Sequence, residues 1–184
     1  AALYAAPVGV GDLWHERVGF WGSVEGLDLS LLRPAAKEYF FSRPVIDRMV
    51  EPDQLATAPF QFWKCDLMTV QEADLETVEG EGIGVVAERE GDIHGLAVWF
   101  DVGFGAPAAG EEVVLSTSPW NPPTHWRLAL LVMDEPMKVH REQQLSLAVR
   151  MSRNASFPRH YLVTAGLQNT QTHAAALKSF RLWR

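Results

Sequence analysis

Apolar residues recur at two different periods along the chain. Over residues 12–24 they follow the spacing of a helix, with Trp14, Val18 and Trp21 in one stripe. Over residues 145–153 leucine, valine and methionine alternate with serine, alanine and arginine, which is the period of a half-buried strand. The pattern therefore predicts a helical first quarter and a strand-rich remainder.

Two short helices are expected in the first quarter. Asp12 can cap the first helix by accepting backbone hydrogen bonds. Asp28 or Ser30 can cap the second, over residues 28–41, where Pro34 suits the first turn. The helices carry more large apolar side chains than they can bury against each other, so we expect the rest of the fold or a second subunit to cover some of them. These side chains are Leu13, Trp14, Phe20, Trp21, Leu27, Leu29, Leu31, Leu32, Tyr39, Phe40 and Phe41.

The remainder of the chain carries strand patterns without an intervening helical one. In residues 60–68 the alternation places Trp63, Cys65 and Leu67 on the apolar face, so Cys65 is interpreted as a small buried residue. Turn signals such as residues 105–112 separate the segments, which favours an antiparallel β-barrel or barrel-like sandwich. The expected strands are residues 60–68, 83–90, 94–104, 113–118, 125–133, 145–153, 160–167 and 177–183.

Composition and charge narrow the classes of partner. The chain has 184 residues, 47% of them hydrophobic, which is enough for one compact domain with an insertion. Its 16 basic and 23 acidic residues give a net charge of -7, so we expect no direct nucleic-acid binding and some attraction for Lys/Arg-rich peptides. No apolar run reaches the roughly 20 residues needed to span a bilayer, and no membrane partner is expected. The first residues do not resemble a signal peptide, and we expect a piece of a longer protein.

Familiar catalytic and metal-binding motifs are missing from the sequence. The six histidines show no HxH, HxxxH or HExxH spacing, so no metal site is predicted. No glycine-rich phosphate loop occurs at a strand-to-helix turn. Ser116 and Ser118 lack the flanking glycines of a hydrolase nucleophile. The acidic residues within 72–82 are interpreted as a solvated turn.

The tryptophan residues allow a different interpretation of the chain's function. Trp63, Trp99, Trp120 and Trp126 on a β-scaffold could form a sugar-binding platform, although the position of Trp63 on an apolar face favours the core. From the residues alone, an unrelated carbohydrate-binding module therefore remains an alternative.

Several ordered segments resemble the carboxy-terminal half of a type I protein arginine methyltransferase. They are LYAAPV at residues 3–8, GFWGSVEGLDLSLL at 19–32, HGLAVWFDVGF at 94–104, STSP at 116–119 and THW at 124–126. The resemblance covers nearly the whole chain in the right order, and it is greatest to the isoform 6 branch.

The resemblance implies a domain organisation. Residues 1–11 would be the end of a linker or strand from a Rossmann-like cofactor domain that is absent from this chain. Residues 12–43 would be a helical dimerisation arm and residues 44–184 a substrate-side β-barrel. A homodimer would form through the arm, whose contacts would be Leu13, Trp14, Phe20, Trp21, Leu27, Leu29, Leu31 and Leu32.

The resemblance also assigns roles to the THW residues. Pro122 and Pro123 restrict the backbone, which would hold the following residues at the barrel rim. The family's threonine-histidine-tryptophan loop forms one wall of the substrate-arginine groove. By this resemblance Thr124, His125 and Trp126 would bind substrate. His125 would act in catalysis by pairing with an acid of the cofactor domain. Alternatively, Trp126 plugs the barrel end and His125 is a solvated loop residue.

The implied activity is transfer of methyl groups from S-adenosylmethionine to protein arginines, giving mono- and asymmetric dimethylarginine. Arg-rich proteins such as histone tails would be the substrates, and the location would be nuclear or cytoplasmic. The family's paired glutamates and cofactor glycines lie outside the segments matched here. We therefore expect this chain alone to be inactive, and a non-catalytic dimer partner remains an alternative.

Overall fold

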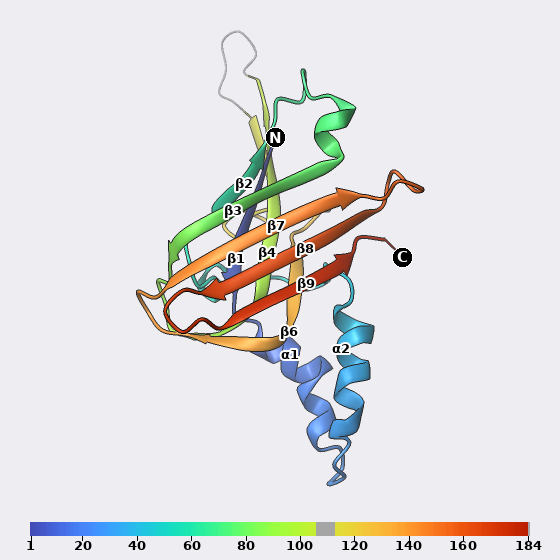
Figure 1. Cartoon of the computed structure of the whole chain (residues 1–184), viewed down its shortest axis with the longest axis vertical. Helices are drawn as coiled ribbons and strands as arrows, with labels where there is room; N and C mark the ends of the chain where they lie inside the picture. The colour runs from blue at the N-terminus through green and yellow to red at the C-terminus, as the bar shows by residue number, and fades with distance from the viewer. Residues whose placement is uncertain (106–112, 184) are drawn as a thin grey trace.

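Two antiparallel sheets and a helical projection form the part of the chain that the computed structural model describes, residues 1–105 and 113–183 (Figure 1). The expected mainly β class with an inserted helical segment is confirmed. The helices are α1 (Gly11–Arg17) and α2 (Arg33–Phe41), with short 3-10 turns η1 (Gly19–Gly22), η2 (Ser30–Leu32), η3 (Pro52–Gln54) and η4 (Glu72–Leu75). The strands are β1 (Ala2–Val8), β2 (Phe60–Lys64), β3 (Thr77–Val86), β4 (Gly91–Phe104), β5 (Val113–Ser116), β6 (Ala129–Val139), β7 (Gln144–Arg153), β8 (Tyr161–Asn169) and β9 (Ala175–Arg181).

The long strand β4 organises the first sheet, whose order is β2-β1-β4-β5 with β6 also paired to β4. One edge of β4 pairs with β1, which places Tyr4 opposite Trp99. The other edge pairs first with β6 and then with β5, so Asp101 lies opposite Ser116. Side chains of β1, β4 and β5 are thereby brought together on one face.

The second sheet is a meander of the order β3-β7-β8-β9. Its strands follow one another in the chain except for the excursion between β3 and β7. In β7 the predicted alternation is confirmed, because Leu145, Leu147 and Val149 are buried while Ser146 and Ala148 are only partly buried. One face of this sheet therefore supplies a continuous apolar surface.

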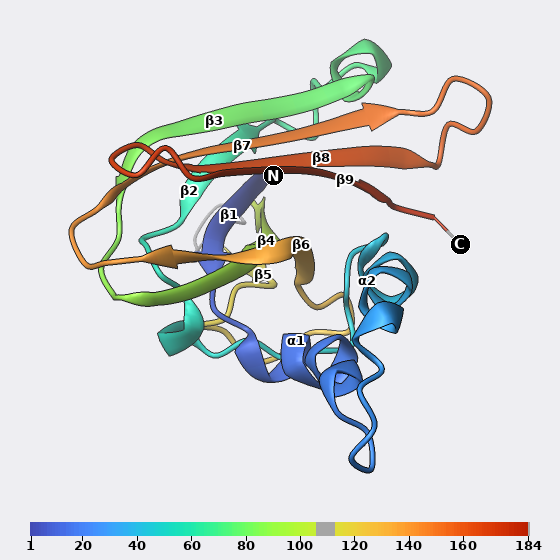
Figure 2. The same cartoon turned by 60° about the horizontal axis from the view of Figure 1, so that its bottom comes forward.

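Two hydrophobic cores share the first sheet. The first core lies between the sheets and includes Leu96 of β4 and Phe180 of β9. The second lies between the opposite face of the first sheet and the helices, and includes Trp99 of β4 and Phe41 of α2. Figure 2 shows the second sheet on one side of the first sheet and both helices on the other. The centre of β4 is consequently buried on both faces.

The two sheets meet along two seams, which gives the fold its barrel-like form. Along one seam β3 comes so close to β2 that a Cβ added at Gly80 would lie 2.2 Å from the carbonyl oxygen of Phe62. Along the other, Lys178 of β9 donates to the carbonyl oxygen of Val132 at 3.1 Å and to Asp134 of β6 at 2.7 Å. Gly80 thus permits the close approach of the sheets along one seam, and Lys178 links them by hydrogen bonds along the other.

Some expected boundaries are wrong. Strand β2 ends at Lys64, so Cys65 is half-buried and Leu67 is exposed, while Phe62 points into the core. Strand β6 begins at Ala129, four residues after the expected start, because residues 122–128 form a loop. The expected turn at 105–112 lies outside the described residues apart from its first glycine.

The helix caps also differ in part from the prediction. Helix α1 has Val10 at its N-cap, and Asp12 lies in the first turn rather than at the cap. Before η2, Asp28 accepts a hydrogen bond from the backbone N–H of Ser30 at 2.9 Å. Pro34 occupies the first turn of α2, as predicted.

Residues 1–11, expected to be the end of a linker or strand, contain a strand. Ala2–Val8 forms β1, which is hydrogen-bonded to β2 on one edge and to β4 on the other. Ala5 and Ala6 are fully buried there. This segment is therefore an interior strand of the first sheet.

Candidate functional site

The loop between β5 and β6 is fixed at its start by hydroxyl groups. The backbone N–H of Phe100 donates to Thr117 Oγ1 at 3.0 Å, and this hydroxyl lies 3.2 Å from the Phe100 carbonyl oxygen. Ser118 donates from its backbone N–H to Ser116 Oγ at 3.1 Å and from its side chain to Asn121 Oδ1 at 2.6 Å. The STSP segment therefore ties the loop to β4.

The other end of this loop enters the second core. Arg127 has a φ of 56°, an uncommon conformation for a residue with a side chain, and the next residue, Leu128, is buried. Leu130 and Val45 exchange backbone hydrogen bonds of 2.8 and 2.9 Å, which join the start of β6 to the segment after α2. The intervening THW residues thus lie between two anchored ends.

The structure places the three THW residues in different environments. Trp126 is 61% exposed, and its ring meets those of Phe100 and His125 edge-on at centroid distances of 6.5 and 6.3 Å. The alternative in which Trp126 plugs the barrel is therefore wrong, whereas His125 is exposed as that alternative expects. Thr124 is partly buried, and its Oγ1 has no hydrogen-bond partner within the described residues.

A recess of about 190 Å³ lies beside the loop. Thr124 lines it together with Arg48, which forms an ion pair with Asp12 of α1. His125 and Trp126 are not among its lining residues. The fold therefore brings Thr124 close to a guanidinium at the base of the arm, while the other two THW side chains lie outside the recess.

The helical projection exposes many apolar side chains, as the sequence predicts. Leu31 is 93% exposed and Leu27 65% exposed, and Phe20 and Leu32 are also exposed. Trp14, Trp21 and Leu29 are partly buried. Tyr39, which was outside the expected contact set, is 81% exposed. Figure 1 shows α1 and α2 extending side by side away from the sheets.

Leu13 is a correction to the expected set of contacts. It is 2% exposed and belongs to the second core, so it packs within this chain. The far end of the projection is a tight turn, in which Val24 and Leu27 exchange backbone hydrogen bonds of 2.9 Å. Glu25 and Gly26 take positive φ values of 50° and 81° between them.

A buried histidine lies where the projection leaves the first sheet. The backbone N–H of Val10, the residue before α1, donates to His94 Nδ1 at 3.2 Å. His94 belongs to β4 and is 8% exposed. Its burial lowers the pKa of the imidazole, while the nearby carboxylate of Asp92 acts in the opposite direction. The neutral ring therefore accepts the hydrogen bond that anchors α1.

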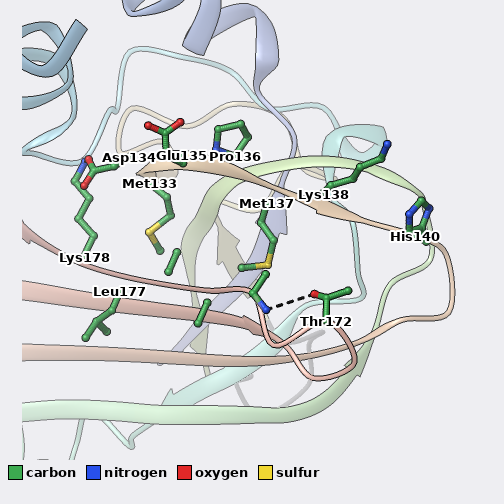
Figure 3. A pocket seen from close by; sticks show the side chains of 13 residues that line it. Met133, Asp134, Glu135, Pro136, Met137, Lys138, His140, Thr172, Leu177 and Lys178 are labelled. Carbon is green, nitrogen blue, oxygen red and sulfur yellow. Dashed lines mark hydrogen bonds and ion pairs between the residues drawn. The ribbon is translucent and has the colours of Figure 1, made fainter.

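A groove of about 660 Å³ follows the seam between β6 and β9 (Figure 3). Met133 and Met137 of β6 and Leu177 of β9 line it, together with charged groups such as Lys178 and Asp134. The sequence could not predict this groove because its two walls are about 40 residues apart and meet only through the closure of the barrel.

Aromatic residues gather in a second recess, of about 320 Å³, on the face of the first sheet that also carries the helices. Tyr4 and Trp99 stack with centroids 6.1 Å apart, and Trp120 meets Trp99 edge-on at 5.8 Å. Trp99 is buried, whereas Trp120 is 54% exposed. Because Trp63 packs against the other core, the four expected tryptophans do not share one sugar-binding platform.

The described residues contain no group of three His, Cys, Asp or Glu side chains that could hold a metal ion. S-adenosylmethionine would need a Rossmann-like unit of parallel strands and helices. Both sheets are antiparallel throughout the described ranges, so these residues do not fit that cofactor. Within the same ranges, the helices are too short and too polar to cross a membrane.

Comparison with known proteins gives a consistent family. A family model described as the arginine methyltransferase oligomerization subdomain matches residues 1–172. Human protein arginine N-methyltransferase 2 is 32% identical over 190 residues, covering 100% of this chain and 44% of the human protein. Protein arginine N-methyltransferase 6 from Xenopus tropicalis is 31% identical over 182 residues, covering 93% of this chain and 52% of that relative.

A solved structure extends the similarity to three dimensions. A chain of the Trypanosoma brucei PRMT1 enzyme-prozyme heterotetrameric complex with AdoHcy is 27% identical and superposes with a TM-score of 0.81. The superposition covers 99% of this chain and 56% of the trypanosomal one. The chain thus spans about half the length of the relatives that it matches.

Proposed function

The chain belongs to the protein arginine methyltransferase family, and on that premise we propose that it is the substrate-side and dimerisation half of a type I enzyme. The whole enzyme would convert protein arginines to mono- and asymmetric dimethylarginine. The observation that carries the proposal is one chain holding both an exposed apolar arm and an anchored THW loop. The chain is similar to isoforms 2 and 6 to a comparable degree, at 32% and 31% identity.

The THW loop would form one wall of the substrate groove. The Trp126 ring is exposed beside the loop and can pack against the aliphatic part of an arginine side chain. His125 is exposed and can pair with an acidic group supplied by the rest of the enzyme. A guanidinium is a weak nucleophile, so the enzyme must activate it; that task would fall to groups outside this chain, while these residues would position the arginine.

S-adenosylmethionine is the proposed methyl donor of the whole enzyme, bound outside the residues described above. The antiparallel sheets of this chain supply no nucleotide-binding turn, so the chain alone would neither bind the donor nor transfer a methyl group. The net charge of -7 supports arginine-rich substrates such as histone tails. We propose a nuclear or cytoplasmic location on the basis of the proposed histone-type substrates, and imaging of the tagged protein tests it.

The apolar arm would mediate homodimer formation. Leu27, Leu31 and Tyr39 are each more than 60% exposed, and such a concentration of exposed apolar groups is typical of a protein interface. Both helices also contribute to the second core, through Leu13 and Phe41, so the arm is held firmly on its own barrel. A firm arm presents its exposed face to a partner without first having to fold.

A methylation assay tests the proposal. Labelled S-adenosylmethionine and a histone-tail peptide would be incubated with this chain and with a version extended by the adjoining native coding sequence. Activity in the extended version alone is the expected result. Activity of the short chain would contradict the assignment of the cofactor site to the rest of the enzyme. In the extended version, Trp126→Ala should raise KM for the peptide. The matched control is Trp183→Ala, which removes a tryptophan outside the THW loop.

A non-catalytic dimer partner is the second candidate function. The similarity to a chain of an enzyme-prozyme complex favours it, because the exposed apolar arm that would contact a partner lies in this chain. Inactivity of the extended version, together with stimulation of an active family member on mixing, would support this function over the first.

A further inference from the structure

The aromatic recess formed by Tyr4, Trp99 and Trp120 contains a carboxylate whose partner is missing. Trp99 and Asp101 are two residues apart in β4 and therefore point to the same face of the first sheet. Tyr4 of β1 lies opposite Trp99, and Ser116 of β5 lies opposite Asp101. The sheet register thus places an acidic group beside two aromatic rings. Trp120, from the loop after β5, adds a third, and all of them line the same recess.

Within the described residues, Asp101 is the member of this group that lacks a hydrogen-bond partner for a buried side-chain atom. Its Oδ1 atom is buried and has no hydrogen-bond partner among residues 1–105 and 113–183. A buried carboxylate oxygen without a donor is costly, and native proteins usually supply a donor from a side chain, a water molecule or a ligand. A hydrogen-bond donor with positive charge would satisfy this atom most strongly.

The surrounding rings favour an organic cation over a simple one. Aromatic faces attract cations that lie within about 6 Å of the ring centroid. Trp120 is 54% exposed at the mouth of the recess, while Tyr4 and Trp99 stack behind it with a 17° angle between their planes. A planar guanidinium can lie against such rings and still donate two hydrogen bonds to a carboxylate.

We propose that this recess binds the guanidinium of an arginine side chain, with Asp101 as the acceptor and the Tyr4 and Trp120 rings as its walls. The site adjoins the recess that Thr124 lines, since the two share Ser118 and Asn121, but Asp101 and the aromatic rings line only the former. The identity of the ligand as a substrate arginine rests on the proposed function. A second arginine of an Arg-rich peptide would be held here while another is methylated.

The binding test uses the 184-residue chain and a small probe, N-acetyl-L-arginine methylamide. Its isostere N-acetyl-L-citrulline methylamide has the same shape without the charge. The indole N–H signals of Trp99 and Trp120 in NMR spectra should shift saturably with the arginine probe and remain unchanged with the citrulline probe. Equal binding of both probes, or of N-acetyl-L-lysine methylamide and the arginine probe, would overturn the guanidinium assignment.

Two variants locate the site. Asp101→Asn should weaken binding of the arginine probe about tenfold, the effect of losing one charged hydrogen bond. Asp47→Asn, which removes an equal charge from an exposed loop after α2, should leave binding unchanged. Trp120→Ala should also weaken binding, unlike Trp183→Ala, and as a surface change it tests the site even if Asp101→Asn unfolds the chain. Unaltered binding in Trp120→Ala would refute the proposal.

This test is distinct from that of the proposed function. Probe binding in a protein whose extended version transfers no methyl group would uphold the site and remove the methyltransferase assignment. Methyl transfer by the extended version without probe binding would uphold the methyltransferase assignment and remove the proposed site.

Discussion

At the residue scale, His94 makes the stability of the fold depend on pH. Burial keeps its pKa below the ordinary value of 6.5, so the folded chain holds the ring neutral where the unfolded chain would protonate it. The stabilising effect is complete above about pH 6.5 and is lost as the pH falls toward the lowered pKa. We predict that the free energy of unfolding in urea decreases between pH 7.5 and pH 5.0.

Substitution isolates this effect from the titration of carboxylates. His94→Leu removes the acceptor of the Val10 N–H and should destabilise the chain by about 1–3 kcal/mol at pH 7.5. The same variant should have a flatter pH dependence. His140→Gln, a change at an exposed histidine, should keep the original slope. An unchanged slope in His94→Leu would show that other groups cause the pH dependence.

Single residues also mark the limit of sequence-based prediction. The exposure of Leu27 and Leu31 could be predicted because two short helices cannot bury so many apolar groups. The burial of Leu13 could not, because it packs in a core with residues of β4 and β6, which lie far away in the sequence. The unpartnered Asp101 oxygen was equally hidden, since only the pairing of β4 with β1 and β5 reveals its surroundings.

At the element scale, the contact between β2 and β3 depends on a missing side chain. Gly80→Ala would place a Cβ 2.2 Å from the Phe62 carbonyl oxygen, so one strand must shift. We predict a loss of about 1–3 kcal/mol or more in the free energy of unfolding, the range observed for overpacking. Gly105→Ala is the control because its added Cβ meets no atom of residues 1–105 and 113–183 within 4 Å. Equal stability of the two variants would mean that the strands separate without cost.

The arm gives a second prediction at this scale. Leu31 is 93% exposed, so Leu31→Ser should leave the stability of the monomer within about 0.5 kcal/mol of the original. It should weaken self-association, which sedimentation velocity measures over a range of protein concentrations. Leu177→Ser replaces an exposed leucine of β9 outside the arm and should leave association unchanged. If both variants associate like the original chain, the arm is not the dimer contact.

Elements with a strong internal pattern were predictable. The period of two in β7 and the Pro34 turn of α2 are determined locally, and both are confirmed. Strand β6 was predicted four residues too early because its apolar run is preceded by aromatic residues that resemble a strand. The loop there depends on the hydroxyl contacts of Thr117 and on the Val45 bridge, which no local pattern encodes.

At the scale of the whole molecule, one sheet divides the interior into two cores. The first sheet is covered on one face by the second sheet and on the other by the helices (Figure 2). The sequence predicts a helical segment and a strand-rich one, but it does not predict that the helices and the second sheet pack on opposite faces of β4. The THW loop and the arm are therefore both attached to β4, through Thr117 at one end and His94 at the other.

The interior position of β1 has a consequence for synthesis on the ribosome. Ala2 pairs with Asp101, so β1 cannot complete its ladder until about a hundred more residues have been translated. At about 5–20 residues per second this delay is roughly 5–20 s. The meander β7-β8-β9 has no such delay, since each hairpin can close as soon as its second strand emerges. Until β4 is made, the nascent chain therefore carries an apolar strand, β1, with one unpaired edge, which makes that strand a natural binding site for chaperones.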